Sequence, residues 1–186
     1  MSAAIDLSRS PVIAAVKSEA QLDRALQTDC EVIFLLFGDI LNIAALTEKV
    51  AAAGRQPIVH LDLIAGLASR EIAVDFIAKT TKAVGVISTK PLLLRRAKEL
   101  GLLTVLRVFA LDSMALANLE KEYALAAPDV VELLPGLMPS VIRTVSGSCP
   151  APVIAGGLIV TKQDILAALR AGAVAVSTTN EESWNV

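Results

Sequence analysis

The sequence is poor in aromatic residues, in cysteine and in net charge, and each shortage argues against a class of protein. Aromatic residues make up 3% of the 186 residues, and the formal net charge is -2. A broad nucleic-acid-binding surface is normally basic and offers aromatic stacking platforms, so these values argue against one. Cys30 and Cys149 have neither CxxC spacing nor a nearby histidine, which argues against a disulfide framework and a metal site.

Long apolar runs are also missing, although 54% of the residues are hydrophobic and the mean hydropathy is +0.63. No run approaches the roughly 20 residues of a membrane-spanning helix. The apolar residues instead come in short bursts such as Val32–Phe37, which are typical of parallel strands buried on both faces. The N-terminal MSAAIDLSRSPV lacks the basic and apolar regions of a signal peptide, so we expect a cytoplasmic protein with no membrane partner.

The sequence does contain a regular alternation of short apolar runs and helical patterns. Ser18 with Gln21 and Thr161 with Asp164 have the spacing of capping boxes, which mark helix starts. The intervening runs predict eight strands: Val12–Val16, Val32–Phe37, Ile58–Leu63, Val84–Ile87, Leu103–Phe109, Val130–Leu134, Val153–Ala155 and Val174–Ser177.

Strict alternation of strand and helix predicts an α/β fold, and eight repeats favour a closed (β/α)₈ TIM-type barrel. We expect one compact barrel domain over residues 1–186, with residues 1–10 as a loosely ordered tail and a very short last helix from about Asn180 to Trp184. Such barrels typically have about 250 residues, so an open flavodoxin-like sheet is the alternative.

Charged residues follow apolar residues on one face of four predicted strands. Because side chains alternate with period two, Lys17, His60, Asp62, Arg107 and Glu132 converge at the barrel mouth if these faces point inward. Each also has a structural interpretation: a solvated lysine, a hydrogen-bonded core histidine, or internal ion pairs. Burying charge costs several kcal/mol without compensation, so five ionisable residues in such apolar surroundings indicate a site.

Two adjacent glycines, Gly156 and Gly157, end the seventh predicted strand, and Ser177 and Thr178 end the eighth. Barrels of this type commonly bind phosphate at the loops after strands seven and eight. Glycine lets the backbone approach a ligand closely, and the hydroxyl groups add donors. We therefore predict a phosphate site there, neutralised by Lys17 or Arg107.

The inferred ligand is a small phosphorylated polyol or sugar. Asp62 and Glu132 would accept hydrogen bonds from its hydroxyl groups. One histidine and scattered carboxylates form no recognisable metal-ligand set, and neither a serine-nucleophile motif nor a Walker loop is present. We expect no metal, no cofactor and no catalytic residues.

Several stretches together resemble the glycerol-uptake operon antiterminator regulatory protein family, from Pro11 to Trp184. The resemblance is carried by EVIFLLFGDI (31–40), VHLDLIAGL (59–67), IST (87–89), RRAKELGL (95–102), LDS (111–113), VELLPGLMP (131–139), IAGGLI (154–159) and AGAVAVSTTNEESW (171–184).

The resemblance implies a single-domain barrel that senses glycerol 3-phosphate and acts on the leader mRNA of glycerol-catabolism genes. Glycerol 3-phosphate is a phosphorylated polyol, which agrees with the ligand inferred from the residues. Lesser candidates at strand ends are Asp39, Ser88 and Gly136.

The residues leave both a catalytic role and the RNA-binding surface open. Lys17 and Glu132 resemble the lysine and the general base of triosephosphate isomerase in placement, so the alternative function is an isomerase or lyase acting on a phosphorylated three-carbon substrate. An RNA surface is hard to find: Arg95, Arg96 and Lys98 form the best basic cluster, but they also fit a solvated helix face. RNA binding would then need a local patch or a homo-oligomer.

Overall fold

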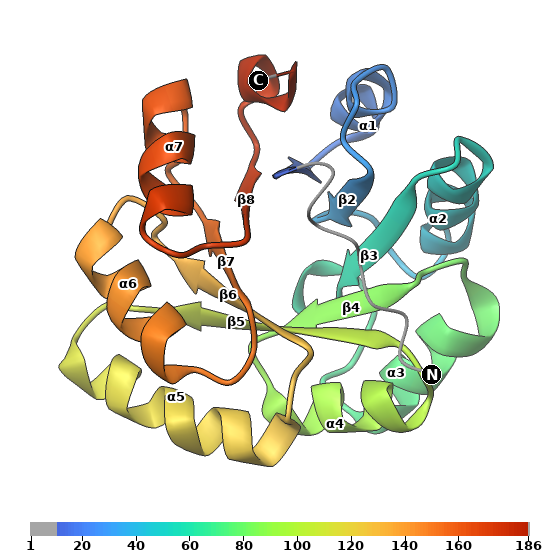
Figure 1. Cartoon of the computed structure of the whole chain (residues 1–186). Helices are drawn as coiled ribbons and strands as arrows, with labels where there is room; N and C mark the ends of the chain where they lie inside the picture. The colour runs from blue at the N-terminus through green and yellow to red at the C-terminus, as the bar shows by residue number, and fades with distance from the viewer. Residues whose placement is uncertain (1–10, 186) are drawn as a thin grey trace.

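The chain folds as a closed barrel of eight parallel strands in the order β1 to β8, with β8 hydrogen-bonded back to β1 (Figure 1). The computed structural model describes residues 11–185, so the predicted tail at residues 1–10 lies outside the described residues. The strands are β1 (Val12–Val16), β2 (Val32–Leu35), β3 (Gln56–His60), β4 (Gly85–Ser88), β5 (Leu103–Phe109), β6 (Val130–Leu134), β7 (Val153–Gly156) and β8 (Ala175–Thr178).

Helices surround the barrel and run back antiparallel to the strands (Figure 1). The predicted TIM-type barrel is therefore confirmed, and the open sheet is wrong because β1 and β8 pair. The helices are α1 (Glu19–Ala25), α2 (Ile43–Ala52), α3 (Glu71–Thr80), α4 (Pro91–Glu99), α5 (Ser113–Ala126), α6 (Pro139–Ser148) and α7 (Lys162–Arg170), with the 3₁₀ helices η1 (Leu61–Leu63) and η2 (Glu181–Asn185).

Short elements explain how a barrel closes in fewer than 200 residues. The eighth helix of the repeat is replaced by the single 3₁₀ segment η2, close to the predicted short helix. Trp184 of η2 is buried, and its indole N–H donates to the carbonyl of Thr178 at 2.9 Å. One buried indole thus anchors η2 to the carboxyl end of β8.

One of the two predicted helix-start signals is confirmed in full and the other in part. Thr161 and Asp164 form a reciprocal capping box at α7. Ser18 caps α1 by accepting from the N–H of Gln21, but the Gln21 side chain accepts from the N–H of Lys17 instead of Ser18. The predicted box at α1 is therefore only half formed.

The barrel divides the apolar residues into an interior cluster and an outer cluster between strands and helices. Ile13, Ile58, Val105 and Ile154 belong to the interior cluster, so the predicted inward faces of β1, β3 and β5 are confirmed. The next inward positions lie at the carboxyl ends of the strands. No helix among residues 11–185 has the length and apolar character needed to cross a bilayer.

One strand boundary changes the site. β3 ends at His60, and the chain turns into η1 over Leu61–Leu63, so the predicted strand Ile58–Leu63 is too long. The period-two alternation stops at the turn. Asp62 therefore does not share the inward face of Ile58 and His60, and the predicted alternation is wrong for that residue.

Candidate functional site

A cavity of about 670 Å³ opens at the carboxyl ends of the strands, within the size range of small-molecule sites. It lies over the interior cluster, at the mouth of the barrel. Six of the predicted residues line it: Lys17, Arg107, Glu132, Gly157, Ser177 and Thr178. His60, Asp62 and Gly156 are not among its lining residues.

Glu132 is the centre of the polar cluster at this mouth. It is 1% exposed, and its Oε2 accepts from Nε of Arg107 at 2.6 Å while its Oε1 accepts from the hydroxyl of Ser177 at 2.5 Å. Arg107 and Glu132 are direct partners in the register of β5 and β6. Because both carboxylate oxygens accept strong hydrogen bonds, the buried charge is compensated.

Arg107 keeps donors for a ligand. Only its Nε is used, and its two terminal guanidinium nitrogens make no hydrogen bond to residues 11–185. Its side chain is 10% exposed and lines the cavity. A guanidinium fixed on one side by Glu132 presents its free edge in a defined direction, which suits bidentate binding of an oxyanion.

The paired glycines serve two different purposes. A Cβ on Gly156 would lie 2.6 Å from the Ser177 hydroxyl and 2.7 Å from Oε1 of Glu132. Gly156 lies on β7, between β6 and β8, so its missing side chain is what lets Glu132 reach Ser177 across an intervening strand. Gly157 has φ +75°, in the left-handed region that favours glycine, and lines the cavity.

The hydroxyl groups predicted to bind phosphate already have acceptors. Ser177 donates to Glu132, and Thr178 donates to the carbonyl of Ile159 at 2.6 Å. In contrast, the backbone N–H groups of Gly157, Leu158 and Thr179 donate to no acceptor within residues 11–185. Main-chain amides after β7 and β8, more than hydroxyl protons, are therefore the free donors at this corner.

Asn180 ties the two loops of this corner together. Its side-chain amide donates to the carbonyl of Val160 at 2.6 Å, and Ser183 donates to the same carbonyl at 2.7 Å. The loop after β7 is thereby held against η2, which fixes the positions of the free amides.

His60 lies deeper, with 2% of its surface exposed and its Nδ1 without a hydrogen-bond partner. Burial, reinforced by the positive charge of Arg107, lowers the pKa of His60 to about 4. The imidazole is therefore neutral at pH 7. Oδ2 of Asp62 is 3.9 Å from Nδ1, too far for a hydrogen bond.

Asp62 faces the neighbouring loop after β4. It accepts from the hydroxyl of Ser88 at 3.1 Å and from the N–H of Thr89 at 2.8 Å, and Nζ of Lys90 is 3.2 Å from its Oδ1. Burial alone would raise the pKa of Asp62, but the bonds from Thr89, Lys90 and Ser88 outweigh it and lower the pKa. Asp62 therefore fastens two loops in this structure, rather than facing the cavity.

The lesser candidates also have local partners. Ser88 bonds Asp62, and Asp39 accepts from the N–H of Leu41 at 2.7 Å. Gly136 packs against Gly156, since a Cβ on it would lie 3.1 Å from the Gly156 nitrogen. None of the three is among the residues that line the cavity.

Apolar and amide residues were missed by the sequence prediction. The cavity wall includes Leu36, Leu63, Phe109, Leu134, Leu158, Thr179 and Asn180. Apolar residues at or shortly after strand ends were the available signal, because a loop on the surface has little reason to carry them.

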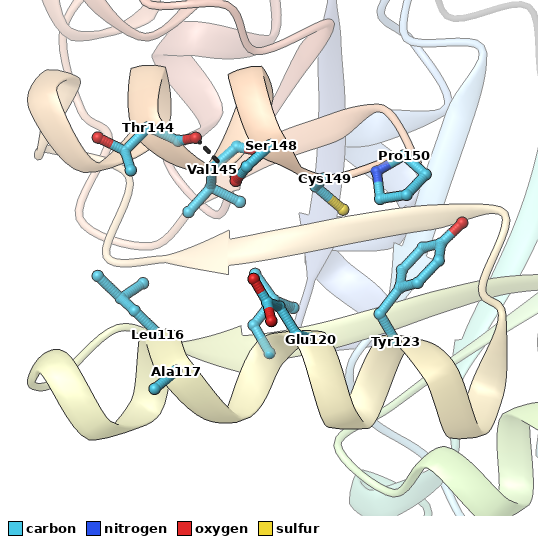
Figure 2. Close-up of a pocket in the computed structure, with 10 residues that line it drawn as sticks. Leu116, Ala117, Glu120, Tyr123, Thr144, Val145, Ser148, Cys149 and Pro150 are labelled. Carbon is cyan, nitrogen blue, oxygen red and sulfur yellow. Dashed lines mark hydrogen bonds between the residues drawn. The ribbon is translucent and has the colours of Figure 1, made fainter.

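A second cavity of about 500 Å³ lies between α5 and α6, away from the barrel mouth (Figure 2). Leu116, Tyr123 and Val145 line it, and the hydroxyls of Thr144 and Ser148 there donate to carbonyls of their own helix. No buried charge or free buried donor points into it among the described residues. The mouth is therefore the better candidate, since polar groups converge only there.

No group of three or more histidine, cysteine, aspartate and glutamate side chains within residues 11–185 is arranged to hold a metal ion. The basic cluster on α4 is largely neutralised. Arg96 pairs with Asp75 at 2.7 Å and with Glu99 at 2.9 Å, and Nζ of Lys98 is 3.3 Å from Asp129. A helix face of this kind fits solvation better than RNA binding.

Gly156→Ala tests the reach of Glu132 across β7. The added methyl would overlap Oε1 of Glu132 and the Ser177 hydroxyl, so we expect a loss of about 1 to 3 kcal/mol in the free energy of unfolding. Gly147→Ala is the control: it lies in α6 with nothing within 4 Å of the new Cβ, so we expect a gain of up to about 1 kcal/mol. Urea unfolding measures both, and equal stability of the two variants would contradict the packing described.

His60 predicts a dependence of stability on pH. Its pKa is about 4 in the folded chain and about 6.5 when unfolded, so the unfolded state takes up a proton first as the pH falls. Stability should therefore drop between pH 6.5 and pH 4, by up to about 3 kcal/mol from this group. His60→Asn removes that share, so in plots of the free energy of unfolding against pH the variant should fall less than the unaltered protein between pH 6.5 and pH 4. Parallel curves would contradict the buried neutral imidazole.

A protein of Escherichia coli (strain K12), the uncharacterised YgcP, is 39% identical over 180 residues, covering 97% of this chain and 94% of that protein. The crystal structure of the glycerol uptake operon antiterminator regulatory protein from Listeria monocytogenes is 30% identical, covers 97% of each chain and superposes with a TM-score of 0.93.

A glycerol uptake operon antiterminator-related protein from Thermotoga maritima is 34% identical over 93% of this chain and 96% of its own, with a TM-score of 0.82. Residues 12–184 match the family described as glycerol-3-phosphate responsive antiterminator. The chain belongs to the glycerol-3-phosphate responsive antiterminator family.

Proposed function

We propose that this protein is a non-catalytic sensor that binds glycerol 3-phosphate at the barrel mouth and, in response, acts on the leader mRNA of glycerol-catabolism genes to prevent premature termination. The observation that carries the proposed ligand site is that Arg107, held by Glu132 through its Nε, lines the same cavity as residues with unbonded main-chain amides. Family membership supports the regulatory half. A small phosphorylated polyol fits a cavity of about 670 Å³ with one polar corner.

The ligand phosphate is proposed to lie at the corner formed by the loops after β7 and β8. The amides of Gly157, Leu158 and Thr179 are unbonded donors there, and Lys17 and Arg107 line the same cavity. Two cations and several amides compensate a phosphate dianion without a metal ion. In this proposal the hydroxyl groups of Ser177 and Thr178 do not bind the phosphate. They donate to Glu132 and to the carbonyl of Ile159, and so hold the corner in position.

The ligand hydroxyl groups are proposed to face Glu132 and His60. His60 is neutral at pH 7, so its unpartnered Nδ1 is free to accept or donate one hydrogen bond when a ligand or side-chain movement brings a group within reach. Asp62 would reach a ligand only by giving up its bonds to Ser88 and Thr89. We therefore assign it to loop positioning within this proposal.

Catalysis is less well supported than sensing. Both oxygens of Glu132 already accept hydrogen bonds from protein groups, one from Arg107 and one from Ser177, so the carboxylate is engaged as a structural partner. Lys17 is exposed, whereas a Schiff-base lysine usually lies in a desolvated pocket. An isomerase or lyase would need different surroundings for both groups.

The ligand proposal predicts a selective rise in melting temperature with glycerol 3-phosphate. Phosphate alone should give a smaller shift and glycerol none, because most of the binding energy comes from the charged corner. Lys17→Ala should raise the Kd by about tenfold, since it removes one cation next to the phosphate. Lys162→Ala, at the start of α7 and outside the cavity, is the matched control and should bind as the unaltered protein does.

Nuclear magnetic resonance of the same samples should show glycerol 3-phosphate unchanged. Equal shifts with all three compounds would overturn the site, whereas turnover abolished by Glu132→Gln would overturn the sensor and favour an enzyme. Arg107 is unsuitable as the first variant, because its removal leaves the buried Glu132 charge unpaired.

The RNA proposal predicts coupling between two ligands. Leader RNA of a glycerol-catabolism operon should bind more tightly when glycerol 3-phosphate is present, by roughly 5- to 150-fold for a typical coupling energy. By linkage, the RNA must tighten glycerol 3-phosphate binding by the same factor. Titrations in both orders measure this, and RNA affinity independent of glycerol 3-phosphate would contradict a responsive regulator.

A further inference from the structure

Large apolar side chains are exposed mainly at the end of the barrel that holds the cavity. In this fold the βα loops and the first turns of the helices share that end. Six consecutive βα units each expose a leucine there, with 43% to 89% of its surface accessible: Leu41, Leu63, Leu92, Leu111, Leu137 and Leu158. We call this surface, together with Ile40, Ile72, Phe109, Met114 and Val160 of the same units, the mouth face.

The remainder of the described surface is different. Outside the mouth face, the exposed large hydrophobic residues among residues 11–185 are only Leu125, Leu166 and Val174. Scattered apolar residues are ordinary on a protein surface, but a concentration at one end indicates an interaction site.

The backbone holds the most exposed of these leucines outward. Leu41 is 89% exposed, and its N–H donates to Oδ1 of Asp39, which also accepts from Asn42. Asp39 forms a β-bridge with Ala65, which ties this loop to the loop after β3. A turn fastened in this way keeps an apolar side chain exposed to water. Burying that side chain against a partner would be favourable.

Leu111 is presented in a similar way on the opposite part of the ring. It is 81% exposed and lies between two anchored residues. Ala110 donates to the carbonyl of Leu134 at 2.7 Å, and Asp112 caps α5 by accepting from Ala115 at 2.8 Å. These backbone anchors reduce the loop entropy that would be lost when such a rim associates.

The mouth face offers enough apolar area for a stable interface. Burying a large aliphatic side chain removes on the order of 100 Å² from water, so at their exposed fractions its members offer roughly 700 Å². A standard interface buries about 800 Å² per partner, of which slightly more than half is apolar. The largest apolar patch of a typical monomer is about 300 to 600 Å².

We propose that the mouth face is a self-association surface through which two copies of this chain pack mouth to mouth. Homodimer interfaces are more apolar than other interfaces, and a two-fold contact needs only one self-complementary patch. A net charge of -2 gives little repulsion between copies. An RNA partner fits less well, because Phe109 is the one aromatic among the large hydrophobic residues exposed on this face. The features that support self-association do not depend on the ligand proposed above.

Sedimentation equilibrium of the full chain tests the proposal. The unaltered protein should have twice its mass of 19.5 kDa at concentrations of about 10 to 100 μM, as expected for a dimer with a micromolar or tighter Kd. Leu111→Glu and Leu41→Glu each place a carboxylate on both sides of the interface, so each should raise the dimer Kd at least about 100-fold. Neither residue lines the cavity, so binding of glycerol 3-phosphate reports separately on the proposed function.

Leu125→Glu is the matched control, since it introduces the same change at an exposed leucine near the other end of α5. It should stay dimeric, and circular dichroism should show that all three variants fold. A monomeric unaltered protein, or a dimer that only Leu125→Glu disrupts, overturns the proposal. A further outcome is that the unaltered protein and all variants are monomeric and that Leu41→Glu no longer binds leader RNA. That result would assign the mouth face to RNA and would also overturn the dimer proposal.

Discussion

The hydrogen-bonded group of Arg107, Glu132 and Ser177 is the constraint on which the barrel mouth depends. A carboxylate that is 1% exposed is tolerated only because a guanidinium and a hydroxyl donate to its two oxygens. The same contacts orient Arg107 toward the cavity and use up the hydroxyl proton of Ser177. The guanidinium that we propose to bind the ligand phosphate is therefore positioned by a charge of the opposite sign.

Backbone geometry completes the arrangement. Gly156 leaves room for Glu132 to reach β8 across β7, and Gly157 turns the chain so that the next amides lack internal acceptors. Asn180 then fastens the loop after β7 to η2. The segment η2 thus supports the loops next to the cavity, with Trp184 as its buried anchor.

The mouth of the barrel has a polar centre and an apolar rim on the same surface. The cavity gathers charge at its centre, whereas the loops around it hold leucines in solvent. A ligand that neutralises the centre and a second copy that covers the rim would act on adjacent residues. This closeness offers a physical route by which small-molecule binding and assembly could influence one another in an antiterminator.

Alternation of apolar and polar residues is local, so the sequence alone predicted the eight strands, their inward faces and the placement of Lys17, Arg107 and Glu132 at the mouth. It also predicted the paired glycines as a special feature of strand seven. The tertiary structure decided the rest. Strand register pairs Arg107 with Glu132. Barrel closure brings the Ser177 hydroxyl to 2.5 Å from Oε1 of Glu132. The turn after β3 takes Asp62 to the loop of Ser88, because a change of backbone conformation ends the period-two pattern. These contacts join residues from distant parts of the chain, and no local pattern specifies them.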